Sequence, residues 1–111
     1  MAWVEAGDAE PTTEVRAIRA GEAHVALAHA GGAWHAFSDD CTHHECPLSD
    51  GWLEGTTIEC ACHGSVFDVT TGAAVRGPAT EPIAVFPVVV RDGLVWVELS
   101  PSTDADQEHP V

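Results

Sequence analysis

The sequence predicts an all-β protein, and three observations support this prediction. Over most of the length, apolar and polar residues alternate with a period of two, as in strands with one buried face. The apolar runs are short and end at Gly, Pro, Asp or Ser. No segment carries the 3.6-residue period of a long amphipathic helix. The 111 residues suffice for one domain with one modest core.

Seven segments are predicted to be strands because each is short, rich in apolar residues and bounded by turn-forming residues. They are Glu14 to Arg19, Ala23 to Ala30, Ala33 to Phe37, Thr57 to Cys60, Val66 to Asp68, Ile83 to Val90 and Leu94 to Leu99.

Three turns are predicted between these strands, and a proline lies within one of the strands. The pairs Gly31-Gly32 and Asp92-Gly93 lie between apolar runs and have the composition of tight hairpin loops, which need positive φ. The segment 68–72 (DVTTG) is a further turn. Pro87 interrupts the sixth strand, because proline has no backbone N–H. That strand should therefore lie at a sheet edge or carry a bulge.

Two segments lack the strand pattern. One is Ser38 to Leu53, which contains much of the chemistry discussed below. The other is the polar, acidic end of the chain from Ser100 on. We therefore predict one domain over residues 1–100 and a flexible acidic tail over residues 101–111.

The chain is strongly acidic, with eighteen Asp and Glu against four Arg, no Lys and a formal charge of −14. Such a charge repels phosphate backbones and anionic lipids, so neither nucleic acid nor a membrane surface is expected as a partner. The acidity either keeps the protein soluble or forms a surface that docks on basic partner proteins. Composition leaves both interpretations open.

The sequence contains no signal for export or membrane insertion. No apolar stretch approaches the roughly 20 residues of a membrane-spanning helix. The first residues, Met1 to Glu5, lack the basic and apolar regions of a secretory signal. We therefore expect a cytoplasmic protein.

All four cysteines and three of the seven histidines lie in two short boxes, Cys41 to Pro47 (CTHHECP) and Cys60 to Ser65 (CACHGS). In a chain without a secretion signal, grouped Cys and His favour metal or redox chemistry over a disulfide framework. The first box offers Cys-x-His and the second offers Cys-x-x-His, which together make a mixed Cys₂His₂ ligand set.

Two kinds of metal centre accept two thiolates and two imidazoles. Structural zinc is one, but zinc sites usually pair cysteine with cysteine and histidine with histidine at short spacing. Here each box supplies one of each. A two-iron cluster suits that arrangement better, because one iron can take both thiolates and the other both imidazoles. Zinc remains the alternative.

The segments CTHHECPLSDG (41–51) and CACHGSVFD (60–68) resemble the two signature boxes of the Rieske family. The flanking LEG (53–55), TTGA (70–73), GPA (77–79) and PI (82–83) are also similar to the surroundings of those boxes in Rieske ferredoxins. The resemblance extends from about Trp34 to Leu99. It implies a Rieske fold of stacked antiparallel sheets, with a cluster-binding subdomain of two loops at one tip.

The resemblance also implies the roles of individual residues. One Rieske-type [2Fe–2S] cluster per chain would be held by Cys41 and Cys60 on the buried iron and by His43 and His63 on the outer iron. Cys46 and Cys62 match a pair that forms a disulfide between the two loops in one branch of the family, with two reduced thiols as the alternative. Ser65 matches the position of a hydroxyl that raises the reduction potential of the cluster in high-potential relatives. Phe67 stands where those relatives have a tyrosine.

The other histidines and the tryptophans are assigned ordinary structural roles. His44 directly follows a ligand, so its side chain should point away from the metal. The three histidines in predicted strands are expected to be strand residues: His24, His29 and His35. The four tryptophans are expected to be core or cap residues: Trp3, Trp34, Trp52 and Trp96. Trp52, close to the first box, is a candidate for shielding the cluster.

The expected function is one-electron transfer by a soluble carrier, not catalysis. The sequence shows no nucleophile with a neighbouring base, no mononuclear iron triad and no Gly-rich nucleotide loop. Stand-alone Rieske chains of this size resemble ferredoxins that carry electrons from a flavin reductase to an aromatic-ring-hydroxylating oxygenase. The alternatives are a small subunit of a nitrite reductase-like complex and a structural zinc or redox-sensing domain.

Docking is expected to be transient and acidic, with the carrier itself a monomer. Five carboxylates lie within or beside the first box: Asp39, Asp40, Glu45, Asp50 and Glu54. Because loops at the tip of a β-domain are exposed, we expect all five to face solvent and to steer basic partner surfaces toward the cluster.

Overall fold

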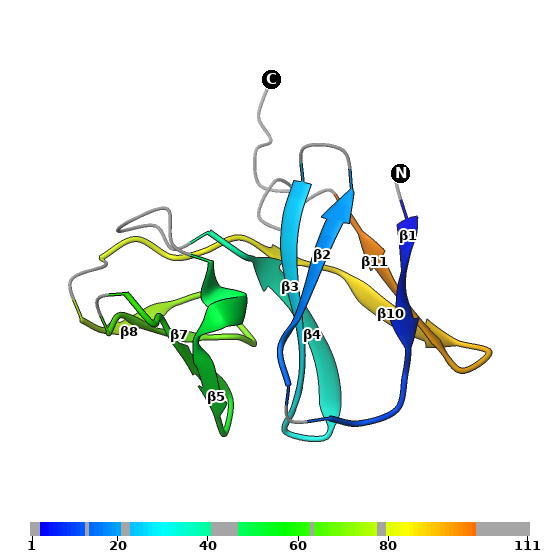
Figure 1. The fold of residues 1–111 in the computed structure, drawn as a ribbon, viewed down its shortest axis with the longest axis horizontal. Coiled ribbons are helices and arrows are strands. Elements are labelled where there is room, and N and C mark those ends of the chain that lie inside the picture. Colours follow the sequence, from blue (N-terminus) through cyan, green and yellow to red (C-terminus); the bar gives the residue numbers. More distant parts are fainter. Residues whose placement is uncertain are drawn as a thin grey trace.

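The computed structural model describes residues 3–12, 14–20, 23–40, 47–62, 64–77 and 80–99. These residues form three antiparallel sheets, which lie side by side along the long direction of the molecule (Figure 1). The predicted all-β class is confirmed. The helical content of the described residues is one short 3-10 turn, η1 (Leu48–Asp50), and no helix there is long and apolar enough to span a bilayer.

The sheets have three or four short strands each. The first contains, in spatial order, β1 (Trp3–Asp8), β11 (Leu94–Glu98) and β10 (Val88–Arg91). The second contains β2 (Arg16–Ala20), β3 (Ala23–Ala30), β4 (Ala33–Ser38) and β9 (Val85–Phe86). The third contains β5 (Trp52–Glu54), β6 (Thr57–Glu59), β7 (Val66–Asp68) and β8 (Ala74–Arg76).

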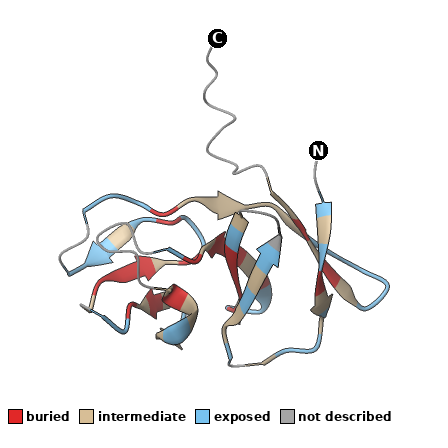
Figure 2. Ribbon diagram, turned by 45° about the horizontal axis from the view of Figure 1, so that its top comes forward, coloured by how far each residue is buried: buried red, intermediate tan, exposed pale blue. Residues whose placement is uncertain are grey.

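Strand β3 connects two hydrophobic cores, because successive strand residues point to opposite faces. Val25 and Leu27 pack with residues of the first sheet, such as Val95 and Val97. On the other face of β3, small alanines at positions 26, 28 and 30 pack with residues of the third sheet. Figure 2 shows the resulting buried residues concentrated where the sheets meet. The third sheet therefore rests on the rest of the domain through β3.

The predicted hairpin turns are confirmed. Gly31 and Gly32 have φ of 61° and 83°, and Asp92 and Gly93 have φ of 56° and 77°. Two successive residues with positive φ match the turn type that suits the twist of paired strands. The turn at 68–72 is also present, with the Gly72 amide donating to the Asp68 carbonyl over 2.7 Å.

Pro87 divides the predicted sixth strand into two strands of different sheets. β9 pairs with β4 at the edge of the second sheet, and β10 pairs with β11 at the edge of the first. The prediction of an edge position is confirmed, since proline cannot donate to a ladder. The Pro87 carbonyl still accepts a hydrogen bond from the Glu98 amide at 3.0 Å. One apolar run thus joins two sheets.

Three strands were not predicted: β1, β5 and β8. β1 contains a register irregularity between Glu5 and Asp8, which hides its period of two. β5 and β8 are three residues each, too short for a period to be read. Strands this short are stabilised by their neighbours rather than by their own sequence.

Of the four tryptophans, which were predicted to be core or cap residues, Trp34 belongs to a core cluster and the other three do not. Trp34 is buried and Trp96 is half-buried, but Trp3 is 38% and Trp52 is 54% exposed. Trp52 lies on the three-residue strand β5, at the edge of the third sheet. Its exposure argues against a shielding role. The strand positions of His24, His29 and His35 are confirmed.

Candidate cluster-binding site

The second box is a tight loop between β6 and β7. Cys60 follows the last residue of β6 and is buried in the core beneath the loop. Its amide donates to the Ser65 carbonyl over 2.7 Å, and the Gly64 amide donates to the Cys60 carbonyl over 3.1 Å. Gly64 has φ of 78°, which only glycine adopts easily. These hydrogen bonds close the loop and fix the Cys60 backbone.

Gly77 supports this loop from the side. It has φ of 97°, and a Cβ built on it would lie 2.6 Å from the Ser65 Cα and 2.9 Å from the Gly64 carbonyl oxygen. No side chain fits in that space. The absence of a Cβ therefore lets the chain that follows β8 run directly against the second box.

The predicted tuning residues lie under the same loop. Ser65 and Phe67 are both fully buried. Phe67 pairs with Ile58 across the β6–β7 ladder and packs in the same core cluster as Cys60. Any hydroxyl added at Phe67 would thus enter an apolar environment.

The first box lies between β4 and η1, and the described residues on its two sides are tied together. Asp40 and Pro47 form an isolated antiparallel bridge. The Leu48 amide donates to the Asp39 carbonyl over 2.6 Å. The two ends of the first box are therefore joined. We call the paired residues Asp39, Asp40, Pro47 and Leu48 the neck of the first loop. The six residues between Asp40 and Pro47, including Cys41, His43, His44 and Cys46, lie outside the described residues, as does His63.

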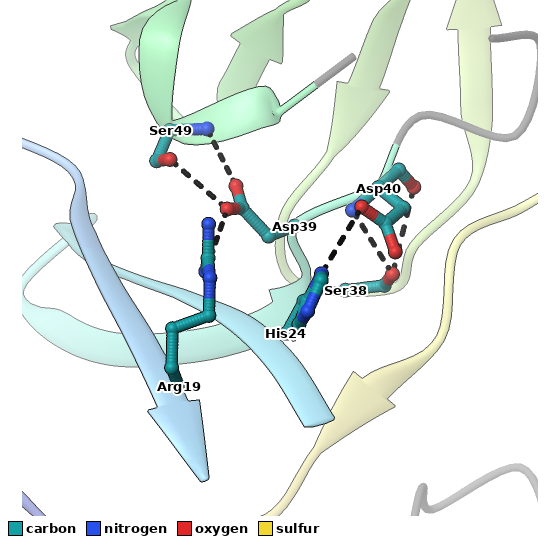
Figure 3. A network of polar contacts seen from close by, with 6 residues as sticks. All are labelled: Arg19, His24, Ser38, Asp39, Asp40 and Ser49. Atoms are coloured by element: carbon teal, nitrogen blue, oxygen red, sulfur yellow. Dashed lines mark hydrogen bonds and ion pairs between the residues drawn. The ribbon is translucent and has the colours of Figure 1, made fainter. Parts of the chain in front are cut away.

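Asp39 is buried, which corrects the expectation that it is an exposed tip residue. Its exposed fraction is 1%. Its Oδ1 accepts from the Ser49 amide at 2.7 Å, and its Oδ2 accepts from the Ser49 hydroxyl at 3.1 Å and from Arg19 at 3.2 Å (Figure 3). The run of carboxylates suggested exposure, but Asp39, directly after β4, has a buried side chain. The neighbouring Asp40, together with Asp50 and Glu54, is exposed as expected.

The two described cysteines differ. Cys60 is buried and has a free thiol, whereas Cys62 is exposed and takes part in a further interaction. A buried thiol at the base of the loop is the environment expected for a thiolate ligand shielded from water. The one described member of the predicted donor set, Cys60, therefore fits an iron–sulfur cluster. Within the described ranges, no three His, Cys, Asp or Glu side chains gather around a common point.

Comparison with known proteins identifies the family. The sequence profile of the Rieske [2Fe–2S] domain matches residues 2–87. The chain belongs to the Rieske [2Fe–2S] domain family. The resemblance read from the two boxes is thereby confirmed, as are the Rieske fold and the [2Fe–2S] cofactor. The alternative of a structural zinc domain is wrong.

The relatives of this Rieske domain include ferredoxins. The chain is 42% identical over 92 residues to ferredoxin CarAc of Metapseudomonas resinovorans, covering 83% of this chain and 86% of the relative. A chain from a complex of oxygenase and ferredoxin in carbazole 1,9a-dioxygenase has a TM-score of 0.84 and 36% identity, covering 90% of this chain and 95% of that one. The Sphingomonas yanoikuyae B1 ferredoxin has a TM-score of 0.80 at 32% identity, covering 86% and 96%.

Proposed function

We propose that this Rieske domain is the ferredoxin of a multicomponent aromatic-ring-hydroxylating oxygenase and carries single electrons to the terminal oxygenase. The likeness to ferredoxin CarAc carries this proposal, because it extends over most of both chains. The structural likeness to a chain from an oxygenase–ferredoxin complex agrees with it. The role is electron transfer and not catalysis. A flavin-dependent reductase would supply the electrons, and the carrier would work as a cytoplasmic monomer.

The four predicted ligands would divide between two irons. Cys41 and Cys60 would hold the buried iron, and His43 and His63 the outer iron. When bound, the cluster supplies one-electron redox chemistry, with the added charge favoured at the iron that has neutral imidazole ligands. The burial of Cys60 supports its assignment to the buried iron. The chain itself excludes water from that thiolate through the core residues around it.

We further propose a disulfide between Cys46 and Cys62. It is supported by the difference between the two described cysteines, since Cys60 is free and Cys62 is not. A bond between the boxes would restrict the loops in the unfolded protein and thereby stabilise the site. The exposure of Cys62 means that reductants can reach it.

A reconstituted electron-transfer chain tests the proposed function. Purified protein loaded with iron and sulfide should show the visible absorption and reduced-state electron paramagnetic resonance (EPR) spectrum of a Rieske cluster. It should also restore turnover when added to a flavin reductase and an aromatic-ring dioxygenase oxygenase. A cluster that forms but supports no transfer to any such oxygenase would refute the ferredoxin role. Co-elution with a large catalytic subunit would favour the nitrite reductase-like alternative.

The reduction potential is expected in the lower part of the Rieske range of about −150 to +300 mV. Ser65→Ala should lower it by roughly 20–60 mV, because one hydrogen bond of about 0.5–1.5 kcal/mol to the reduced cluster would be lost. Phe67→Tyr should raise it by a similar amount and destabilise the protein, since Phe67 is fully buried. Protein-film voltammetry measures both changes. Unchanged potentials in both variants would contradict the tuning role of these residues.

Electron transfer to the oxygenase is expected to depend on exposed carboxylates near the first box. Neutralising Asp40, Asp50 and Glu54 together should lower the second-order rate at low salt by about tenfold or more, and salt should reduce the wild-type rate in the same way. The control is a triple neutralisation of exposed acids on or next to the strands of the first sheet: Glu5, Glu10 and Asp92. Equal losses in both triple variants would show that overall charge, and not a docking face, sets the rate.

A further inference from the structure

We propose that Asp39 is the positioning residue of the first cluster loop. It would hold both sides of the neck from which Cys41 and His43 extend, with Arg19 as its counter-charge. The proposal rests on the proposed ligand roles of these two residues. It assigns a function to a buried carboxylate that the ligand set does not use.

The main chain of Asp39 joins the strand before the loop to the turn after it. Its carbonyl accepts from the Leu48 amide at 2.6 Å, and its own amide donates to the His24 carbonyl over 3.0 Å. Asp39 is therefore fixed to β3 on one side and to η1 on the other. The next residue pair, Asp40 and Pro47, continues the same antiparallel contact.

The side chain of Asp39 supplies the cap that η1 lacks. The residue at the N-terminus of η1 is Pro47, which makes no side-chain hydrogen bond to the turn. Backbone N–H groups at the start of a helical turn need an acceptor. Asp39 Oδ1 accepts from the Ser49 amide at 2.7 Å, and Oδ2 accepts from its hydroxyl at 3.1 Å (Figure 3). A residue ten positions earlier thus does what a local cap would do.

Arg19 compensates the charge of this carboxylate and ties it to a third element. A buried carboxylate without a partner is strongly unfavourable. The Arg19 guanidinium donates to Asp39 Oδ2 over 3.2 Å, and its side chain is 49% exposed. Arg19 lies on β2, so the contacts of Asp39 link β2, the end of β4 and η1. These links orient the neck of the loop relative to the main body of the domain.

Asp40 provides a matched control, because it carries the same charge one residue closer to Cys41. Its side chain is 52% exposed, and its Oδ1 lies 3.7 Å from His24 Nδ1. Among the described residues, no hydrogen bond from η1 to the Asp40 side chain is present, and the Asp40 amide donates to the Ser38 hydroxyl over 3.2 Å. Removing the charge of Asp40 alters the field near the cluster and leaves the contacts of Asp39 in place.

Four variants separate positioning from charge: Asp39→Ala, Asp39→Asn, Arg19→Gln and Asp40→Asn. Hydrogen exchange of the Leu48 and Ser49 amides is measured in the protein without iron. Iron release to a chelator and the EPR spectrum are measured in the loaded protein.

Exchange and iron release should accelerate about tenfold or more in Asp39→Ala, and by several-fold in Asp39→Asn and Arg19→Gln, because buried charge-assisted hydrogen bonds are lost. The EPR line shape should broaden in these three variants. Asp40→Asn should match the wild type in all three measurements.

Two results would overturn the proposal. One is equal acceleration in Asp40→Asn and Asp39→Asn, which would assign the effect to charge near the cluster. The other is wild-type exchange and iron release in Arg19→Gln. The Arg19 side chain is 49% exposed, so this variant removes no buried side chain and decides the matter if the Asp39 variants fail to fold. If the wild-type protein took up no cluster, the proposed function would fail. The exchange of Leu48 and Ser49 in the iron-free protein would still show whether Asp39 holds the neck.

Discussion

Replacing Cys60 with Ser is expected to abolish cluster binding while the protein remains folded. Cys60 is buried at 1% exposure at the base of the second box, and a hydroxyl at this position replaces the thiolate that an iron–sulfur cluster requires. Serine has nearly the same volume as cysteine. The free energy of unfolding of the iron-free protein should therefore fall by only about 1–3 kcal/mol. Iron and sulfide content, visible absorption and thermal unfolding together measure both effects.

Cys62→Ser is the matched control for this experiment, because it removes the sulfur of an exposed cysteine two residues away that is not a predicted ligand. This variant should keep its iron and its EPR signal, and bleach faster on exposure to air or chelator. A Cys60→Ser protein with full iron content would contradict the ligand assignment. Loss of the cluster from Cys62→Ser, with retention in Cys60→Ser, would exchange the roles of the two cysteines.

The second large effect is expected from Gly77→Ala. The added Cβ would lie 2.6 Å from the Ser65 Cα, and the residue would have to keep φ near 97°. Strain at positive φ costs about 1–3 kcal/mol, and overpacking against backbone adds a similar amount. We expect a loss of about 3 kcal/mol or more in the free energy of unfolding, together with displacement of the second box and loss of iron. Chemical denaturation of the iron-free protein and its iron uptake measure the two consequences.

Gly32→Ala separates strain from the clash. Gly32 has φ of 83°, but a Cβ there would meet no atom within 4 Å. Its replacement should cost only the strain, about 1 kcal/mol, and leave iron uptake unchanged. If the two variants lost equal stability and both bound iron normally, the contact between Gly77 and Ser65 would have no role in shaping the site.

The sequence by itself determined the fold class, the tight turns and the family. The short apolar run of β3, the turn residues Gly31-Gly32 and Asp92-Gly93, and the proline at 87 are local signals, and each led to a correct expectation. The boxes around Cys41 and Cys60 are equally local, since the residues that identify a Rieske domain stand a few positions apart. Local spacing is enough where the chemistry depends on neighbours in the chain.

Only the tertiary structure decided which polar and aromatic residues are buried. Asp39 and Asp40 are adjacent acids in the sequence, yet one is enclosed by Ser49 and Arg19 and the other is exposed. Trp34 and Trp52 are likewise indistinguishable by composition and differ in burial. Burial depends on which distant elements cover a side chain, and no pattern within a few residues records those contacts. For the same reason, the division of one apolar run between two sheets at Pro87 became visible only when the partners β4 and β11 were known.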